Sequence, residues 1–200
     1  MASEAQADLE LLTRLIAPLG AEAASPRARD LLARHESLPR VLDACRRSSD
    51  RTETVRHLAT VGEALVAAAK GRLSSQPSLR TSGLAADYLM LEMAHLPIEQ
   101  VRVLFLNASA RLIADEVLAM GTIDHAPTYP REIFRRAIEL GAASIILAHN
   151  HPSGDPKPSE QDVAITRQML KGGAALGIAL FDHLVLSSSG WVTLRAQGLI

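Results

Sequence analysis

The feature that most constrains the fold of this chain is a continuous apolar run, ASIILAH, at residues 143–149. A strand with one face in water alternates apolar and polar side chains, whereas an unbroken apolar run is typical of a central strand covered on both faces. Such strands lie in sheets that carry a layer of helices on each side. Residues 77–200 therefore predict a layered α/β domain.

The segments around this run alternate between helix and strand patterns. Pro97 and Gly141 mark the ends of two of the expected helices. Helices are expected over 82–95, 130–140 and 159–170. Strands are expected over 101–107, 111–122, 178–187 and 191–194.

Residues 1–76 predict a small all-helical domain that is rich in Ala, Leu and Arg. Ser25 and Pro26 predict the N-cap and the first residue of a helix that runs to His35. Further helices are expected over 38–44 and 52–70, and the second should end near Gly71. The polar stretch GRLSSQPS at 71–78 predicts the linker to the α/β domain.

The net charge and the cysteine content exclude several classes of function. The net charge is −1, and residues 1–80 carry 12 basic against 10 acidic side chains, so neither half has the basic surplus of a dedicated nucleic-acid binder. The lone Cys45 excludes an internal disulfide framework and any zinc site built from several cysteines. We expect a cytoplasmic protein, because the sequence shows no signal pattern and no membrane-spanning run.

The chemistry is concentrated in LAHNHPSGDPKPSEQD at residues 147–162. His149 and His151 end the apolar strand, and side chains two residues apart on a strand point to the same face. Asp162 follows in the first turn of the next helix, after a loop stiffened by three prolines. Two imidazoles and one carboxylate suit a single Zn²⁺ with water as its fourth ligand, although Fe²⁺ accepts the same set.

Other interpretations of this segment need weighing. Ser159 and Asp162 also form a capping-box pattern, in which the Asp162 oxygens would serve the helix start instead of a metal. We favour the metal ligand for Asp162. The triplet His-Asn-His has the residues from which one nuclease motif is named. Those nucleases space the three residues widely, so the contiguous triplet does not indicate a nuclease. A zinc deaminase would need a Pro-Cys-x-x-Cys segment, which this sequence lacks.

The arrangement His-x-His-Pro, six residues, Ser, two residues, Asp is the motif of the JAMM (MPN+, JAB) metalloprotease family. It is met here by His149, His151, Pro152, Ser159 and Asp162. The wider text from PREIFRR to GIALFDHLVL resembles the RadC branch of that family, and the resemblance covers about residues 80–200.

The resemblance implies a three-layer JAB/MPN-type domain with a mixed β-sheet flanked by helices. It implies His149, His151 and Asp162 as zinc ligands, and Ser159 as the donor to the substrate oxyanion. It also implies a glutamate from the domain's first strand as the general base. Glu99, immediately before that strand, is the first candidate, and Glu116 of the second strand is the alternative. Asp182 and His183 match the branch too and suggest groups that orient a ligand.

Two functions from different classes follow. The first is a zinc-dependent hydrolase that cuts a peptide or isopeptide bond. The second is a DNA repair or recombination protein that binds DNA weakly through its helical half, with the metal domain accessory. RadC relatives often carry a helix-hairpin-helix unit there, but the region around Gly62 lacks the second glycine of such a hairpin. Arg46, Arg47, Arg51 and Arg56 form the basic cluster of this half, and MPN-type domains often pair as homodimers.

Overall fold

A computed structural model describes residues 2–75, 82–121 and 129–200 and divides the chain into two compact units. We call Met1–Ala68 the helical unit and Ala69–Ile200 the α/β unit, and we describe each by itself. Within the described ranges, no helix combines the length and the apolar content needed to cross a bilayer.

The helical unit is built around apolar side chains from four α-helices. Its core is aliphatic, as the low aromatic content requires, and includes Leu12, Ile16, Ala28, Val41 and Leu58. The Asp8 carboxylate of the first helix accepts a hydrogen bond from the backbone N–H of Leu38 and so caps the third. The elements are α1 (Ala2–Ile16), the 3-10 helix η1 (Ala17–Leu19), α2 (Ala21–His35), α3 (Leu38–Arg47) and α4 (Glu53–Ser75).

Two of the predicted boundaries in this half are wrong. Helix α2 begins at Ala21, and Pro26 lies inside it instead of at its first residue, because the earlier start lets Ala24 pack into the core. Helix α4 continues through Gly71 to Ser75, so residues 71–75 are helical where a linker was predicted. Residues 76–78 of that linker lie outside the described residues. Gly62 lies in the middle of α4, against the stem of Arg46, and therefore in no hairpin.

The α/β unit holds a five-stranded mixed sheet in the order β2-β1-β3-β4-β5. Strand β3 is central and pairs antiparallel with β1 and parallel with β4, while β2 and β5 pair antiparallel at the edges. The strands are β1 (Gln100–Leu106), β2 (Leu112–Met120), β3 (Ser144–Asn150), β4 (Ala179–Ser187) and β5 (Gly190–Thr193). The helices are α5 (Gly83–Met93), α6 (Pro130–Glu139) and α7 (Glu160–Leu176).

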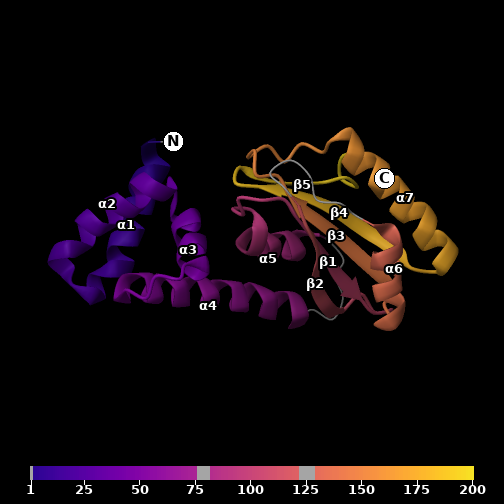
Figure 1. Cartoon of the computed structure of the whole chain (residues 1–200), viewed down its shortest axis with the longest axis horizontal. Helices are drawn as coiled ribbons and strands as arrows, with labels where there is room; N and C mark the ends of the chain where they lie inside the picture. The colour runs from indigo at the N-terminus through magenta and orange to yellow at the C-terminus, as the bar shows by residue number, and fades with distance from the viewer. Residues whose placement is uncertain (1, 76–81, 122–128) are drawn as a thin grey trace. The chain divides into compact units, whose positions relative to one another are not determined.

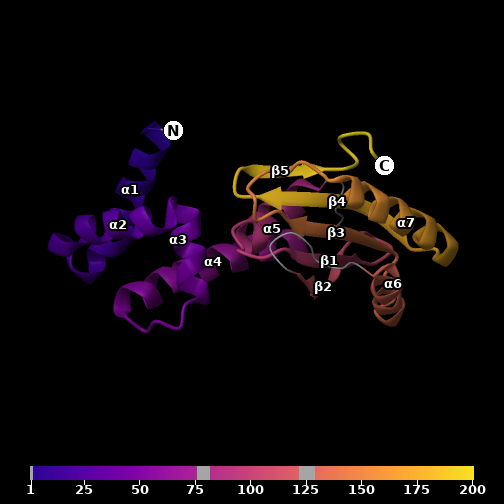
Figure 2. The ribbon, with the colours of Figure 1, turned by 45° about the horizontal axis from the view of Figure 1, so that its top comes forward.

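Helices cover both faces of this sheet, as Figures 1 and 2 show, with α6 and α7 on one side and α5 on the other. The first face buries Val103, Phe105 and Leu147 against Ile133 and Phe134 of α6. The predicted three-layer α/β fold around a mixed sheet is therefore confirmed.

Helix α7 is longer than the sequence predicts. The helix predicted over 159–170 continues through Gly172 and Gly173 to Leu176, and it closes at Gly177 in a left-handed conformation. A β-carbon on Gly172 would meet the Phe134 ring, and one on Gly173 would meet the carbonyl oxygen of Ile178. These glycines therefore allow α7 to pack closely on α6 and on the start of β4.

Candidate metal centre

The structure brings the three predicted ligands together at the carboxyl end of β3. His149 Nε2 lies 3.0 Å from His151 Nε2 and 3.1 Å from Asp162 Oδ1, and His151 Nε2 lies 3.5 Å from Asp162 Oδ2. Zinc with bonds of 2.0–2.1 Å in a tetrahedron separates its ligand atoms by about 3.3 Å. The donor set and its spacing therefore fit a small divalent metal ion.

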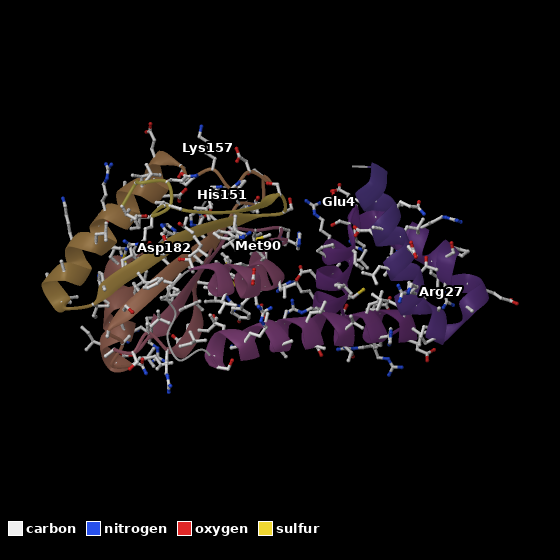
Figure 3. The ribbon with its side chains drawn as sticks, turned by 180° about the vertical axis from the view of Figure 1, so that it is seen from behind. Glu4, Arg27, Met90, His151, Lys157 and Asp182 are labelled. Atoms are coloured by element: carbon white, nitrogen blue, oxygen red, sulfur yellow. The ribbon has the colours of Figure 1, made fainter. Side chains whose placement is uncertain are left out.

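One side of the site is buried, and the other side is accessible to solvent. The His149 side chain is 4% exposed, whereas that of His151 is 19% exposed. Figure 3 labels His151 near the top of this unit, together with Lys157 of the following loop, and Asp182 farther down. A metal held here would be fixed from the interior side and reachable from solvent on the other.

The loop after β3 fixes the ring of His151. The backbone carbonyl of Asp155 lies 2.9 Å from His151 Nδ1, so this nitrogen donates and Nε2 is the atom left to face a metal. The loop is in turn attached to the β4–β5 turn, where the Ser189 hydroxyl donates to the Gly154 carbonyl over 2.6 Å.

A chain of hydrogen bonds also fixes the ring of His149, again with Nδ1 as the donor. The Thr166 hydroxyl donates to the carbonyl of Asp162, so it can only accept from His183 Nδ1, which lies 2.6 Å away. Neutral His183 then offers Nε2 as an acceptor, 2.9 Å from His149 Nδ1. His149 must therefore carry a proton on Nδ1, which leaves Nε2 as the atom that faces the metal position.

The burial of His183 agrees with this assignment. Complete burial is the largest cause that holds the pKa of His183 well below its usual range, and it keeps that ring neutral. Burial alone would raise the pKa of Asp162, but its contacts with the rings of His149 and His151 outweigh burial and lower the pKa of the carboxyl. The hydrogen bond with Asp162 also raises the pKa of His151, and the charge of Glu99 adds to that effect.

Replacing His183 by Phe should weaken zinc binding by about 10–100-fold, because the N–H of His149 loses the acceptor that orients it. Competition against a chromogenic chelator measures this affinity. Thr166→Val removes a hydroxyl one bond further from the ligand and should cost less than His183→Phe. An unchanged affinity in His183→Phe would mean that His183 is only a packing residue.

The predicted capping box of Ser159 and Asp162 is formed in the structure. Asp162 Oδ2 accepts hydrogen bonds of 2.7 Å from both the backbone N–H and the hydroxyl of Ser159, while the Ser159 hydroxyl accepts from the backbone N–H of Asp162. Its Oδ1 faces His149. Oδ2 serves the capping box and also lies 3.5 Å from His151 Nε2, so the capping box leaves Oδ1 available, and the metal role of Asp162 stays a prediction.

The two candidate bases have different surroundings. Glu99 directly precedes β1, and its charge acts on His151. Within the described ranges, no hydrogen bond or ion pair engages its carboxylate. Glu116 of β2 is bound at both oxygens by Arg136 of α6, at 2.8 and 2.6 Å, and these bonds lower its pKa.

Asp182 and His183 act on opposite faces of the sheet, since neighbouring residues of a strand point apart. His183 contacts the ligand His149, as described above. Asp182 accepts a hydrogen bond from the Ser82 hydroxyl and so joins β4 to the start of α5. Asp182 therefore contacts no ligand side chain within the described residues, unlike His183.

Sequence reasoning missed two buried polar residues beside the candidate site, Thr166 and Asn150. Thr166 lies four residues after Asp162 and so on the same face of α7, a spacing that could have identified it. Asn150 stands between the two histidines, but no spacing rule indicates where its amide points. Its contacts are described below.

Comparison with known proteins agrees with this geometry. A family model described as a RadC-like JAB domain matches residues 79–199. A UPF0758 protein of Rhodobacter capsulatus is 43% identical over 204 residues, which cover 99% of this chain and 95% of that protein. A UPF0758 protein of Ruegeria pomeroyi is 43% identical over 132 residues, which cover 66% of this chain and 59% of that protein. The fold, the ligand set and these matches together show that the chain belongs to the RadC family, whose JAB domain is of the JAMM/MPN type.

Proposed function

We propose that the chain is a zinc-dependent hydrolase that cuts peptide or isopeptide bonds. The observation that carries this proposal is the convergence of three ligand atoms, with Nδ1 of both imidazoles held as a donor so that Nε2 faces the metal position, near the Glu99 carboxylate, which no described residue engages. An ordinary structural histidine pair needs neither feature.

In this proposal His149, His151 and Asp162 hold the zinc. When bound, zinc supplies Lewis-acid chemistry that makes a water molecule nucleophilic near neutral pH. Glu99 takes a proton from the attacking water as the new C–O bond forms. It then passes that proton to the amide nitrogen as the C–N bond breaks.

Ser159 is proposed to donate its hydroxyl proton to the developing oxyanion. Its hydroxyl now donates to Asp162 Oδ2, and the residue is exposed at the start of α7. A substrate oxygen can replace Oδ2 as the acceptor by rotation about one side-chain bond. The backbone N–H of Ser159 keeps its own bond to the same oxygen and maintains the helix start.

The DNA-binding alternative rests on the arginine cluster of the helical unit. Arg47 pairs with Asp43 at 2.9 Å and Arg46 lies 3.7 Å from the same carboxylate. Gly62 lies within a helix instead of a hairpin. The described residues therefore add no specific support for this second function.

The hydrolase proposal is tested by incubating the zinc-loaded full chain with a proteome-derived peptide library that includes lysine-branched isopeptides, in ¹⁸O-labelled water. Hydrolysis places one ¹⁸O in each new carboxyl group, which mass spectrometry detects. We expect labelled products from the wild type and none from the His149→Ala/His151→Ala variant. Stoichiometric zinc without labelled products from any peptide would contradict the proposal.

A further inference from the structure

Asn150 lies between the two histidine ligands, and its side chain is completely buried. Its Oδ1 accepts a hydrogen bond of 2.8 Å from the backbone N–H of Gln100. Its Nδ2 donates to the backbone carbonyl of Ile98 at 3.1 Å and to that of Leu96 at 3.4 Å. All of these hydrogen bonds of the Asn150 side-chain amide therefore go to residues 96–100, the segment that leads into β1.

The chemistry of this contact selects asparagine. The segment presents one N–H and two carbonyls, so its partner must accept one bond and donate two. Aspartate keeps the acceptor but sets a carboxylate oxygen against the carbonyls. Leucine has a similar volume and leaves all three buried backbone groups without a partner.

The three backbone groups enclose Glu99, the proposed base. Ile98 and Gln100 are its neighbours in the chain, and both are bound by Asn150. The backbone pairing of β1 with β3 ends at Val101 and His149, so the Asn150 amide continues the link where that pairing stops. Extending the same antiparallel register by two residues sets Glu99 opposite His151.

A second bond completes the fixation of Glu99. Its carbonyl accepts a hydrogen bond of 2.9 Å from the backbone N–H of Gly121, just beyond β2. The backbone of Glu99 is thus held from β2 on one side and from Asn150 on the other. Only the Asn150 side depends on a side chain, and that side chain belongs to the strand that carries the metal ligands.

We propose that Asn150 is a positioning residue that fixes the Glu99 carboxylate relative to the metal ligands. This inference rests on the proposed function, because it gives Glu99 the role of base beside a bound metal. A residue that only stabilised the fold would also be buried and hydrogen-bonded. It would not, however, determine how strongly Glu99 acts on the metal centre.

The test is a double-mutant cycle on the full chain loaded with Co²⁺, whose visible d–d bands report the ligands and their protonation. The proteins are the wild type, Glu99→Gln, Asn150→Leu and the variant with both changes. Ile146→Val is the matched control, since it truncates a buried side chain of the same strand away from residues 96–100. Bound cobalt per chain and the pH midpoint of the spectrum are measured for each.

We expect Glu99→Gln to shift the midpoint in the wild type and to shift it much less in the Asn150→Leu background. The two effects on the proton dissociation constant should differ by at least about threefold, as for residues in one hydrogen-bond network. Ile146→Val should leave the Glu99→Gln shift unchanged. If Asn150→Leu does not fold, the same four-protein cycle is run with Asn150→Asp. The direct effect of the added charge on the pH midpoint is the same with and without Glu99→Gln, so it cancels when the two shifts are compared.

Equal shifts of the midpoint in both backgrounds, with cobalt bound, would overturn the role of Asn150 and leave the metal centre intact. Failure of Co²⁺ to bind the wild type at stoichiometry would overturn the proposed function, and this inference with it. No shift from Glu99→Gln would remove Glu99 as the base and so remove the group that Asn150 positions.

Discussion

Zinc in excess is expected to bind at about one ion per chain and to raise the unfolding temperature by about 10 °C. A ligand at 1,000 times its dissociation constant stabilises the folded state by about 4 kcal/mol. At about 2–4 °C per kcal/mol for a chain of this size, that corresponds to the expected shift. Elemental analysis after desalting gives the stoichiometry, and calorimetry with and without zinc gives the temperature.

The His149→Ala/His151→Ala variant should lose both effects, because one carboxylate alone is a weak zinc site. The matched control is His35→Ala/His57→Ala, which removes two histidines of the helical unit and should keep the zinc and the thermal shift. If the first variant retained as much zinc as the wild type, the metal would be bound elsewhere.

Glu99→Gln is expected to lower kcat/KM for a cleaved peptide by about 100–10,000-fold while zinc content stays at one per chain. Glutamine has the size of glutamate but cannot take the proton from the attacking water. Initial rates on a peptide identified in the labelled-water experiment measure the effect.

Glu116→Gln provides the matched control, since it makes the same chemical change on the neighbouring strand. Glu116 is engaged by Arg136, so its loss should lower stability at neutral pH and leave the rate nearly unchanged. A Glu116→Gln loss as large as that of Glu99→Gln would show that the choice between the two bases is wrong.

Much of the α/β unit could be predicted because its signals are local. The apolar run before His149 identifies a central strand, and the spacing of His149 and His151 places both rings on one face. Asp162 could be placed at a helix start from the capping pattern alone. The sequence therefore predicts where the ligands lie along their elements and, through the family resemblance, which carboxylate lies nearby.

The remainder depends on contacts between distant segments, which no local pattern encodes. The tautomer of His149 is set by His183, 34 residues away, and then by Thr166. The course of α2 through Pro26 follows from burying Ala24, which local propensity cannot weigh against a missing N–H. The continuation of α7 past residue 170 places Gly172 against the Phe134 ring and Gly173 against the Ile178 carbonyl, contacts that no local pattern shows.

The proposed double role of Asp162, at the start of α7 and as a metal ligand, has an evolutionary consequence. A descendant that lost the metal would be released from any demand on its two histidines, but α7 would still need the capping box of Ser159 and Asp162. Selection for a folded domain would therefore keep Ser159 and Asp162 even in a chain that has no catalytic activity. If the proposed function holds, Ser159 and Asp162 are poor indicators of activity among relatives, and the pair His149 and His151 is the part of the motif that would separate an active enzyme from an inactive relative.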